Sequence, residues 1–280
     1  MLFLIVIFGK NKRFSNSFYR IVQCDLVLNL CVYTNSWVHR LAQRPSTGYL
    51  LQNIPRQILV ITSYTMPFFS HLQTVSITLL CFYRYSLLLE FMNFNKFWAK
   101  WYLLVYLGLI TYTIAMILPI SFTFFPLVYN STDGCFVIHP DYYGTNHYVF
   151  GATVWIVSNV HLIIITTLGV LTVSKLRKRF SQHQNDTIRT RDMMKRVTLI
   201  VAINSAIYII IIFWLLVVGV IFPDMNQVTQ FEILVTVSDM ISFSMPYTLL
   251  FFDKNIQEMM SEKIPSFSRN PSSIAVAPMT

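Results

Sequence analysis

The sequence predicts an all-α membrane protein, a seven-transmembrane helix bundle in which the first helix is truncated and six spans are complete. Three observations predict it, and the first is composition: 55% of the 280 residues are hydrophobic and only 12% are charged. An average soluble domain carries about 25% charged residues, and a chain this apolar could not cover a soluble surface with polar groups. The other two observations are the lengths of the apolar segments and the distribution of lysine and arginine.

Apolar segments long enough to cross a bilayer recur along the chain. A membrane-spanning helix needs about 20 mostly apolar residues. Six segments reach that length: 18–38, 57–83, 101–127, 149–173, 197–222 and 231–252. Residues 1–8 form a seventh segment, which at helical rise is only about 12 Å long and covers less than half of the hydrocarbon core. We therefore expect one transmembrane bundle over 1–264, ending in a short cytoplasmic amphipathic segment, and a disordered cytoplasmic tail at 265–280.

The basic residues orient these spans. If residues 9–20 are cytoplasmic, all but three of the 21 lysines and arginines fall in inner segments, and the exceptions are Arg40, Arg44 and Arg56 in the first outer loop. The outer loops at 128–148 and 223–230 contain neither residue type. The positive-inside rule then places the N-terminus outside and the C-terminus in the cytoplasm. The net charge of +9 is thus a feature of one membrane face, which favours the lipid bilayer as partner and not nucleic acid.

Two glycosylation sequons provide a separate test of this orientation. Asn130-Ser-Thr lies in a predicted outer loop, where glycosylation is possible, so Asn130 is the expected glycan site. Asn185-Asp-Thr lies in a predicted inner loop, where it is not.

A few ionisable side chains interrupt the apolar spans, at a cost of about 2.5–3.5 kcal/mol each for an aspartate at a helix centre. Asp25 lies two turns into its span with Asn29 one turn further, and Asp239 lies midway along the last span. We expect no lysine or arginine deep enough to pair with either aspartate. Each must then be hydrogen-bonded by amides or hydroxyls, be protonated, or bind a small cation. Either a conformational switch or ion site, or a polar clip that fixes helix packing, fits this pattern.

Helical phase indicates which side chains face the interior of the bundle. On the span that ends near Arg84, that arginine shares a face with Gln73, Ser70 and Met66. Aromatic and polar residues of other spans fall at a similar depth, which is the usual makeup of a small-molecule site. The expected ligand-binding residues are Met66, Phe69, Ser70, Gln73, Trp155, Asn159, Tyr208, Trp214 and Asp239.

Catalytic patterns are missing from the sequence. It contains no nucleophile with a nearby base, no glycine-rich phosphate loop and no paired carboxylates in a loop. His71 and His161 lie within spans, but neither has a second ligand at i+3 or i+4. We therefore expect no enzyme activity, no cofactor and no metal site.

Several motifs together resemble a known family. They are NSFYR at 16–20 with Asp25 and Asn29 after it, CFYRY at 81–85, and MPYTLLFFDKNI at 245–256. In order and spacing, over about residues 10–260, the chain resembles the nematode serpentine chemoreceptors of the class gamma family and its near relative, class V. The resemblance implies a seven-helix receptor of the G-protein-coupled type in the plasma membrane of sensory cells. Its partners would be a small-molecule ligand of the odorant or pheromone class and a heterotrimeric G protein.

The resemblance also indicates a signalling switch, formed by Asp25, Asn29, Arg84, Tyr85 and Pro246. Rhodopsin-like receptors usually carry an acid before the arginine, but Tyr83 stands there in this sequence. If Arg84 is a switch, its resting partner is then something across the bundle, such as a carbonyl, a hydroxyl or the G protein. The other reading lets Arg84 extend its charge to lipid phosphate between interfacial tyrosines.

Two other functions remain compatible with the sequence. One is a transporter or channel subunit built on six spans, although no internal repeat or matching pair of broken helices supports it. The other is a degenerate receptor that no longer signals.

Overall fold

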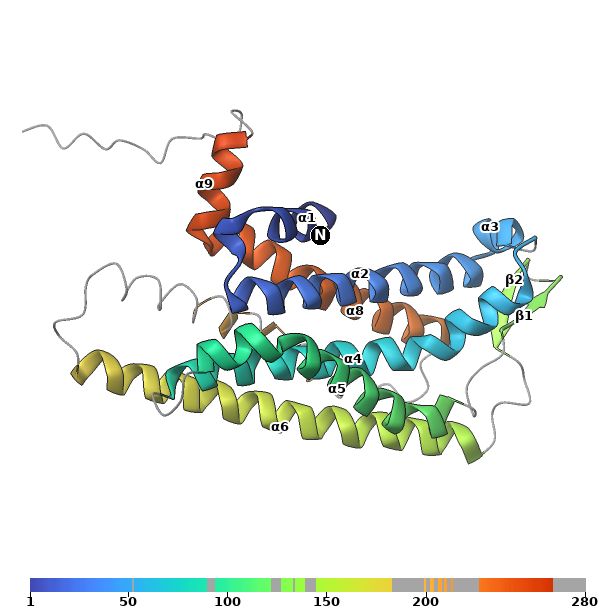
Figure 1. Ribbon diagram of the computed structural model, residues 1–280. Helices are drawn as coiled ribbons and strands as arrows, with labels where there is room; N and C mark the ends of the chain where they lie inside the picture. The colour runs from blue at the N-terminus through green and yellow to red at the C-terminus, as the bar shows by residue number, and fades with distance from the viewer. Residues whose placement is uncertain are drawn as a thin grey trace, which may run out of the picture.

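The computed structural model describes residues 1–51, 53–89, 94–121, 127–132, 134–138, 145–182 and 227–263, with isolated positions between 199 and 213. Long helices lie side by side, and a β-hairpin caps one end of the bundle (Figure 1). The predicted helical membrane bundle is confirmed. Within the described residues, three helical stretches are long and apolar enough to cross a membrane: Lys96–Ile117, Ile156–Lys175 and Val235–Phe252.

The helices are α1 (Leu2–Lys10), α2 (Ser17–Gln43), α3 (Pro45–Gly48), α4 (Arg56–Leu88), α5 (Phe94–Ser121), α6 (Thr145–Gln182), α8 (Gln227–Phe252) and α9 (Lys254–Lys263). Short 3-10 turns occupy Lys12–Phe14 and Tyr49–Leu51, and the strands are β1 (Leu127–Asn130) and β2 (Cys135–Ile138). The described residues do not include the expected tail at 265–280. They include only isolated positions of the expected span at 197–222.

The helix ends follow from local chemistry. The side chain of Asn16 caps α2 by accepting a hydrogen bond from the Tyr19 backbone N–H at 3.2 Å. In the same way, the Asp253 carboxylate caps α9 by accepting from the Asn255 N–H at 2.9 Å. α6 extends to Gln182, nine residues beyond its expected span, because lysine and arginine are good helix formers in water.

The β-hairpin was not expected from the sequence. β1 and β2 pair antiparallel, with Tyr129 opposite Phe136 and their rings 5.2 Å apart. α5 ends at Ser121, so Leu127 lies in a strand and not at the end of a span as predicted. The hairpin seats tightly on Gly48, where an added Cβ would lie 2.8 Å from the Cα of Cys135. A short run of β-branched and aromatic residues beside a turn with Gly134 at φ 66° favours this alternative to helix.

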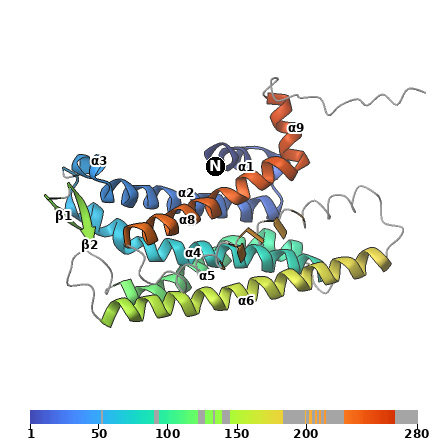
Figure 2. The ribbon, with the colours of Figure 1, turned by 180° about the vertical axis from the view of Figure 1, so that it is seen from behind.

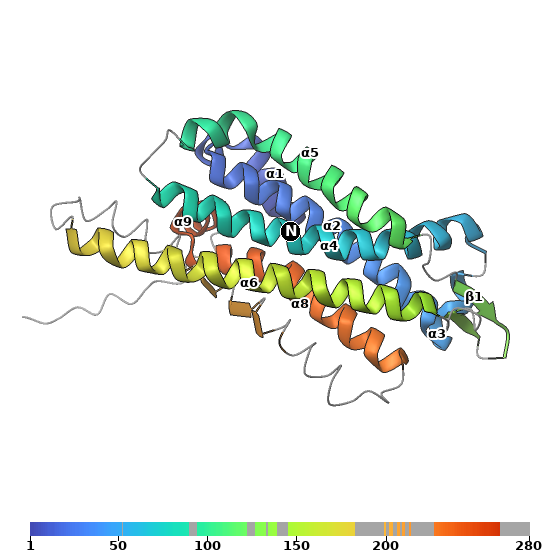
Figure 3. The same ribbon diagram turned by 90° about the horizontal axis from the view of Figure 1, so that it is seen from below.

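α2 and α4 form the centre of the bundle. α2 packs against α4 and α8, while α4 packs against α5 and α6 (Figure 3). The short α1 lies on the part of α2 opposite the hairpin, where the Gln23 amide donates to the carbonyl oxygen of Ile5 at 2.9 Å (Figure 2). α9 lies at this same end of the bundle, away from the hairpin (Figure 1). The largest apolar cluster is found at this α9 end and includes Phe8, Phe14, Leu80 and Trp98. A second cluster joins α4, α6 and α8.

Candidate functional site

Buried polar side chains form three groups along the interface of α2 with α4 and α8. We call them the hairpin-end network, the middle network and the α9-end cluster, by their positions between the two ends of the bundle. Burial of so many polar groups is costly unless they contact one another, so their arrangement is specific and not incidental.

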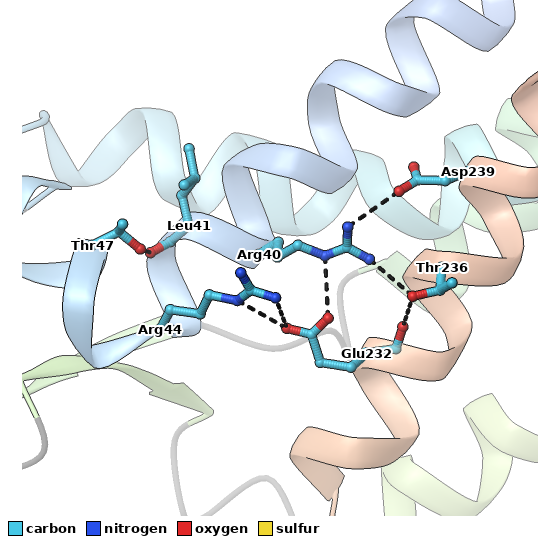
Figure 4. A network of polar contacts seen from close by, with 7 residues as sticks. All are labelled: Arg40, Leu41, Arg44, Thr47, Glu232, Thr236 and Asp239. Carbon is cyan, nitrogen blue, oxygen red and sulfur yellow. Dashed lines mark hydrogen bonds and ion pairs between the residues drawn. The ribbon is translucent and has the colours of Figure 1, made fainter.

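The hairpin-end network joins α2 to α8 through two arginines one turn apart (Figure 4). Arg40 forms ion pairs with the Glu232 Oε2 at 3.2 Å and the Asp239 Oδ2 at 3.3 Å. Its Nη2 also donates to the hydroxyl oxygen of Thr236 at 3.1 Å. Arg44 contacts the other oxygen of Glu232 at 3.3 Å. Ion pairs between two arginines at the C-terminal end of α2 and two acidic residues of α8 thus hold the two helices together.

The pairing of Arg40 with Asp239 corrects the expectation that no basic side chain could reach either aspartate. The expected span ended at residue 38, but α2 continues to Gln43 and places Arg40 on the face that meets α8. The Arg40 side chain is 10% exposed, so the charge lies inside the bundle and not in an outer loop. A contact between residues 199 positions apart depends on how the two helices pack, which the spacing within either helix does not reveal.

One carboxylate oxygen of Asp239, Oδ1, is buried and has no hydrogen-bond partner among the described residues, and we call it the open oxygen. The indole N–H of Trp37 is buried in the same condition, and its ring lies 5.1 Å from the Arg40 guanidinium carbon. Among the described residues, an acceptor and a donor without hydrogen-bond partners therefore lie beside the same arginine.

The middle network surrounds Asp25, which is 1% exposed. Its Oδ1 accepts from Ser76 at 2.6 Å, and its Oδ2 accepts from the Asn29 amide at 2.9 Å. The Gln73 amide donates to the Asn29 Oδ1 at 2.8 Å and to the Ser242 hydroxyl at 2.9 Å. Among the alternatives left open for Asp25, hydrogen bonding by hydroxyl and amide groups is the one observed. The network connects α2, α4 and α8 in the core of the bundle.

The α9-end cluster contains Arg84, whose guanidinium carbon lies 3.8 Å from the ring centroid of Phe18 on α2. Arg84 is only 6% exposed, so it faces the bundle and does not extend to lipid phosphate. Its Nε and Nη2 have no hydrogen-bond partner among the described residues. The contact across the bundle is thus an aromatic face, a partner that the sequence analysis did not consider.

Asp253 lies beside this cluster, at the junction of α8 with α9. Its Oδ2 accepts from the Tyr19 hydroxyl at 2.8 Å, and the Asn255 amide donates to the same hydroxyl oxygen at 3.0 Å. Burial raises the pKa of the Asp253 carboxyl above its ordinary value, although the hydrogen bond from Tyr19 acts in the opposite direction. These contacts fasten α9 to the start of α2.

The expected ligand residues do not all meet in one place. Gln73 and Asp239 belong to the networks described above, whereas Phe69 packs with Phe68 against an apolar cluster of α2 and α4. Met66 and Asn159 are half-buried and Ser70 is exposed. The structure does not describe the side chain of Trp155 or any part of Tyr208 and Trp214.

The expected switch residues divide in a similar way. Asp25 and Asn29 form the middle network and Arg84 lies at the α9 end, while Tyr85 is half-buried and Pro246 is buried in the continuous helix α8. Sequence reasoning missed Arg40 and Phe18. A row of arginines at i and i+4, facing acids at i and i+7 on another span, is a signal that could have identified Arg40.

Comparison with known proteins agrees with this architecture. The sequence model of the family described as Srg family chemoreceptor matches residues 1–260 of this chain. The chain is 28% identical to serpentine receptor class gamma-53 of Caenorhabditis elegans, over 96% of this chain and 89% of that one. It is 27% identical to serpentine receptor class gamma-47 of the same species, over 94% and 86%. These relatives are receptors, and the class gamma resemblance is confirmed. The chain therefore belongs to the Srg family of chemoreceptors.

Proposed function

We propose that this chemoreceptor binds a small environmental molecule at the hairpin end of the bundle and signals to a heterotrimeric G protein at the α9 end. The observation that carries the proposal is the open Oδ1 of Asp239 in the hairpin-end network. A ligand hydroxyl or amine that donates to this oxygen would gain a charge-assisted hydrogen bond in a place shielded from water. Such a ligand would be small, mostly apolar and carry one such donor.

Binding at Asp239 can influence the rest of the bundle because the same carboxylate holds Arg40 of α2. A donor that shares the carboxylate weakens its hold on Arg40 and so changes the α2–α8 contact. On α8, Ser238 and Ser242 flank Asp239, and both contact Gln73 of the middle network. Polar groups of the two networks are therefore neighbours along α8, and this helix connects the hairpin end to the middle of the bundle, where α2, α4 and α8 meet.

At the α9 end, Arg84 offers two buried nitrogen donors, Nε and Nη2, without partners in the described chain. We propose that they meet the G protein when the bundle opens, because a guanidinium is suited to carbonyl and carboxylate oxygens. The basic segment at 175–196, of which residues 175–182 belong to α6, would add positive charge to the proposed cytoplasmic side.

The ligand site can be tested with two matched substitutions of Arg40 partners. The chain is expressed in a reporter cell with a promiscuous G protein and exposed to a panel of volatile and pheromone-like compounds. For an active compound, Asp239→Asn is expected to lower potency by about tenfold or more, the value of one charged hydrogen bond. Glu232→Gln also removes one acidic partner of Arg40, but both oxygens of Glu232 already contact arginines. It should therefore change potency much less.

Equal losses in the two variants would contradict a ligand contact at Asp239. Compound uptake or an ionic current without G-protein activation, in cells with the chain at their surface, would instead favour the transporter or channel reading.

The orientation of the bundle has its own test. Asn130 ends β1, and Ser131 and Thr132 of its sequon are exposed in the hairpin turn. If the hairpin end faces the outside, Asn130→Gln should abolish the mobility shift that glycosidase treatment produces in the wild-type chain. Asn185→Gln is the control and should leave that shift unchanged. A shift that disappears only in the Asn185 variant would reverse the proposed topology.

A further inference from the structure

Two histidines from different helices meet inside the bundle. The rings of His71 on α4 and His161 on α6 have their centroids 5.5 Å apart, with their planes at 72°. Each residue is 7% exposed. The prediction of no metal site considered only ligand spacing within one helix, so it did not include a pair formed between two helices. The ring of Tyr112 on α5, a third helix, lies 5.8 Å from that of His71.

The surroundings of His161 determine which of its nitrogens is free. The Thr78 hydroxyl donates to the carbonyl oxygen of Thr74 at 3.0 Å and lies 3.0 Å from the Nδ1 of His161. A hydroxyl has one proton, and here the Thr74 carbonyl receives it. With the Thr78 proton on that carbonyl, the Nδ1 of His161 is the donor to Thr78, and a lone pair remains on its Nε2. Protein oxygens orient metal-binding histidines in this manner.

The other member of the pair also has an open nitrogen. The Nε2 of His71 is buried and has no hydrogen-bond partner among the described residues. An imidazole nitrogen that loses water without gaining a partner costs free energy. The structure thus places an open Nε2 on His71 and a lone-pair Nε2 on His161 at one helix interface, a pattern that a shared cation would satisfy.

We propose that His71 and His161 bind one monovalent transition-metal cation of the Cu(I) type, which links α4 to α6. Imidazole is a good ligand for copper, and monovalent cations with a filled d shell accept two ligands in a line. Within the described chain, no third His, Cys, Asp or Glu joins the pair. Two neutral ligands in an apolar interface cannot offset the desolvation of a divalent ion, which grows with the square of its charge. The site is independent of the proposed ligand and G-protein contacts.

The test uses the purified full-length chain in lipid nanodiscs under reducing conditions. Cu(I) is added in competition with a chromophoric Cu(I) chelator, and bound copper is counted per chain. One equivalent is expected to remain on the wild-type chain, whereas His71→Gln and His161→Gln should each release it at the same chelator concentration. His39→Gln replaces a buried histidine of α2 and is the matched control, which should keep the copper.

Three further measurements separate this site from other causes. Thr78→Val retains both ligands but removes the hydroxyl that orients His161, and should weaken Cu(I) binding by about 10–100-fold. This variant decides the matter if a histidine variant fails to fold. Cys81→Ala should bind copper as the wild type does, and X-ray absorption should show two nitrogen neighbours. Sulfur neighbours, no copper on the wild-type chain, or copper retained at the wild-type level by either histidine variant would overturn the proposal.

Discussion

Replacing Arg40 with methionine is expected to destabilise the bundle by about 3–5 kcal/mol, the usual cost of removing one partner of a buried ion pair. Methionine retains much of the length of the side chain but leaves the Asp239 carboxylate without its cation. It also removes the ion pair with Glu232, so α2 and α8 lose their main polar connection at the hairpin end. The measurement is the free energy of unfolding by denaturant in detergent micelles.

Two comparisons make this prediction specific. Arg44→Met removes the neighbouring arginine, whose side chain is 52% exposed, and should cost less than about 1 kcal/mol. Arg40→Met combined with Asp239→Asn removes both charges and should recover part of the lost stability, because no buried charge is then left alone. If the Arg40 and Arg44 variants were equally destabilised, the hairpin-end network would not be the buried connection described above.

Arg84→Ala is expected to reduce G-protein activation by about tenfold or more while surface expression and ligand binding persist. Allosteric coupling between two sites typically amounts to about 1–3 kcal/mol, and this substitution removes the group proposed to transmit it. Arg84→Lys retains the charge but not the planar fork, so it should restore only part of the response. Nucleotide exchange on the G protein, measured at matched receptor density, provides the readout.

The contact with Phe18 supplies the control for this second prediction. Phe18→Leu keeps an apolar side chain but removes the ring on which Arg84 rests. We expect its basal signalling to rise, because Arg84 is then held less firmly in the observed position. A full-strength response in Arg84→Ala would contradict the role assigned to this arginine.

The sequence predicted much of the polar core but not its partners. Asp25 and Asn29 were recognised because a polar pair one turn apart inside an apolar span is costly, and they do hydrogen-bond to each other. Helical phase alone predicted that Gln73 faces the interior of the bundle, where it hydrogen-bonds to Asn29 and Ser242. Phe69 was also expected in the ligand site, but it packs into an apolar cluster between α2 and α4. Phase gives a direction around one helix, and which neighbour lies in that direction depends on the packing of the bundle.

The sequence by itself determined the helical membrane class and the family, and it indicated roughly where the long helices of the described residues lie. Hydrophobic length, charge distribution and local motifs are properties of neighbouring residues, and they can be read along the chain. Only the tertiary structure decided that Arg40 meets Asp239, that Arg84 rests on Phe18, and that His71 faces His161. Each of these contacts joins two helices, and the rotation and relative height of packed helices are set by side-chain fit across the whole bundle.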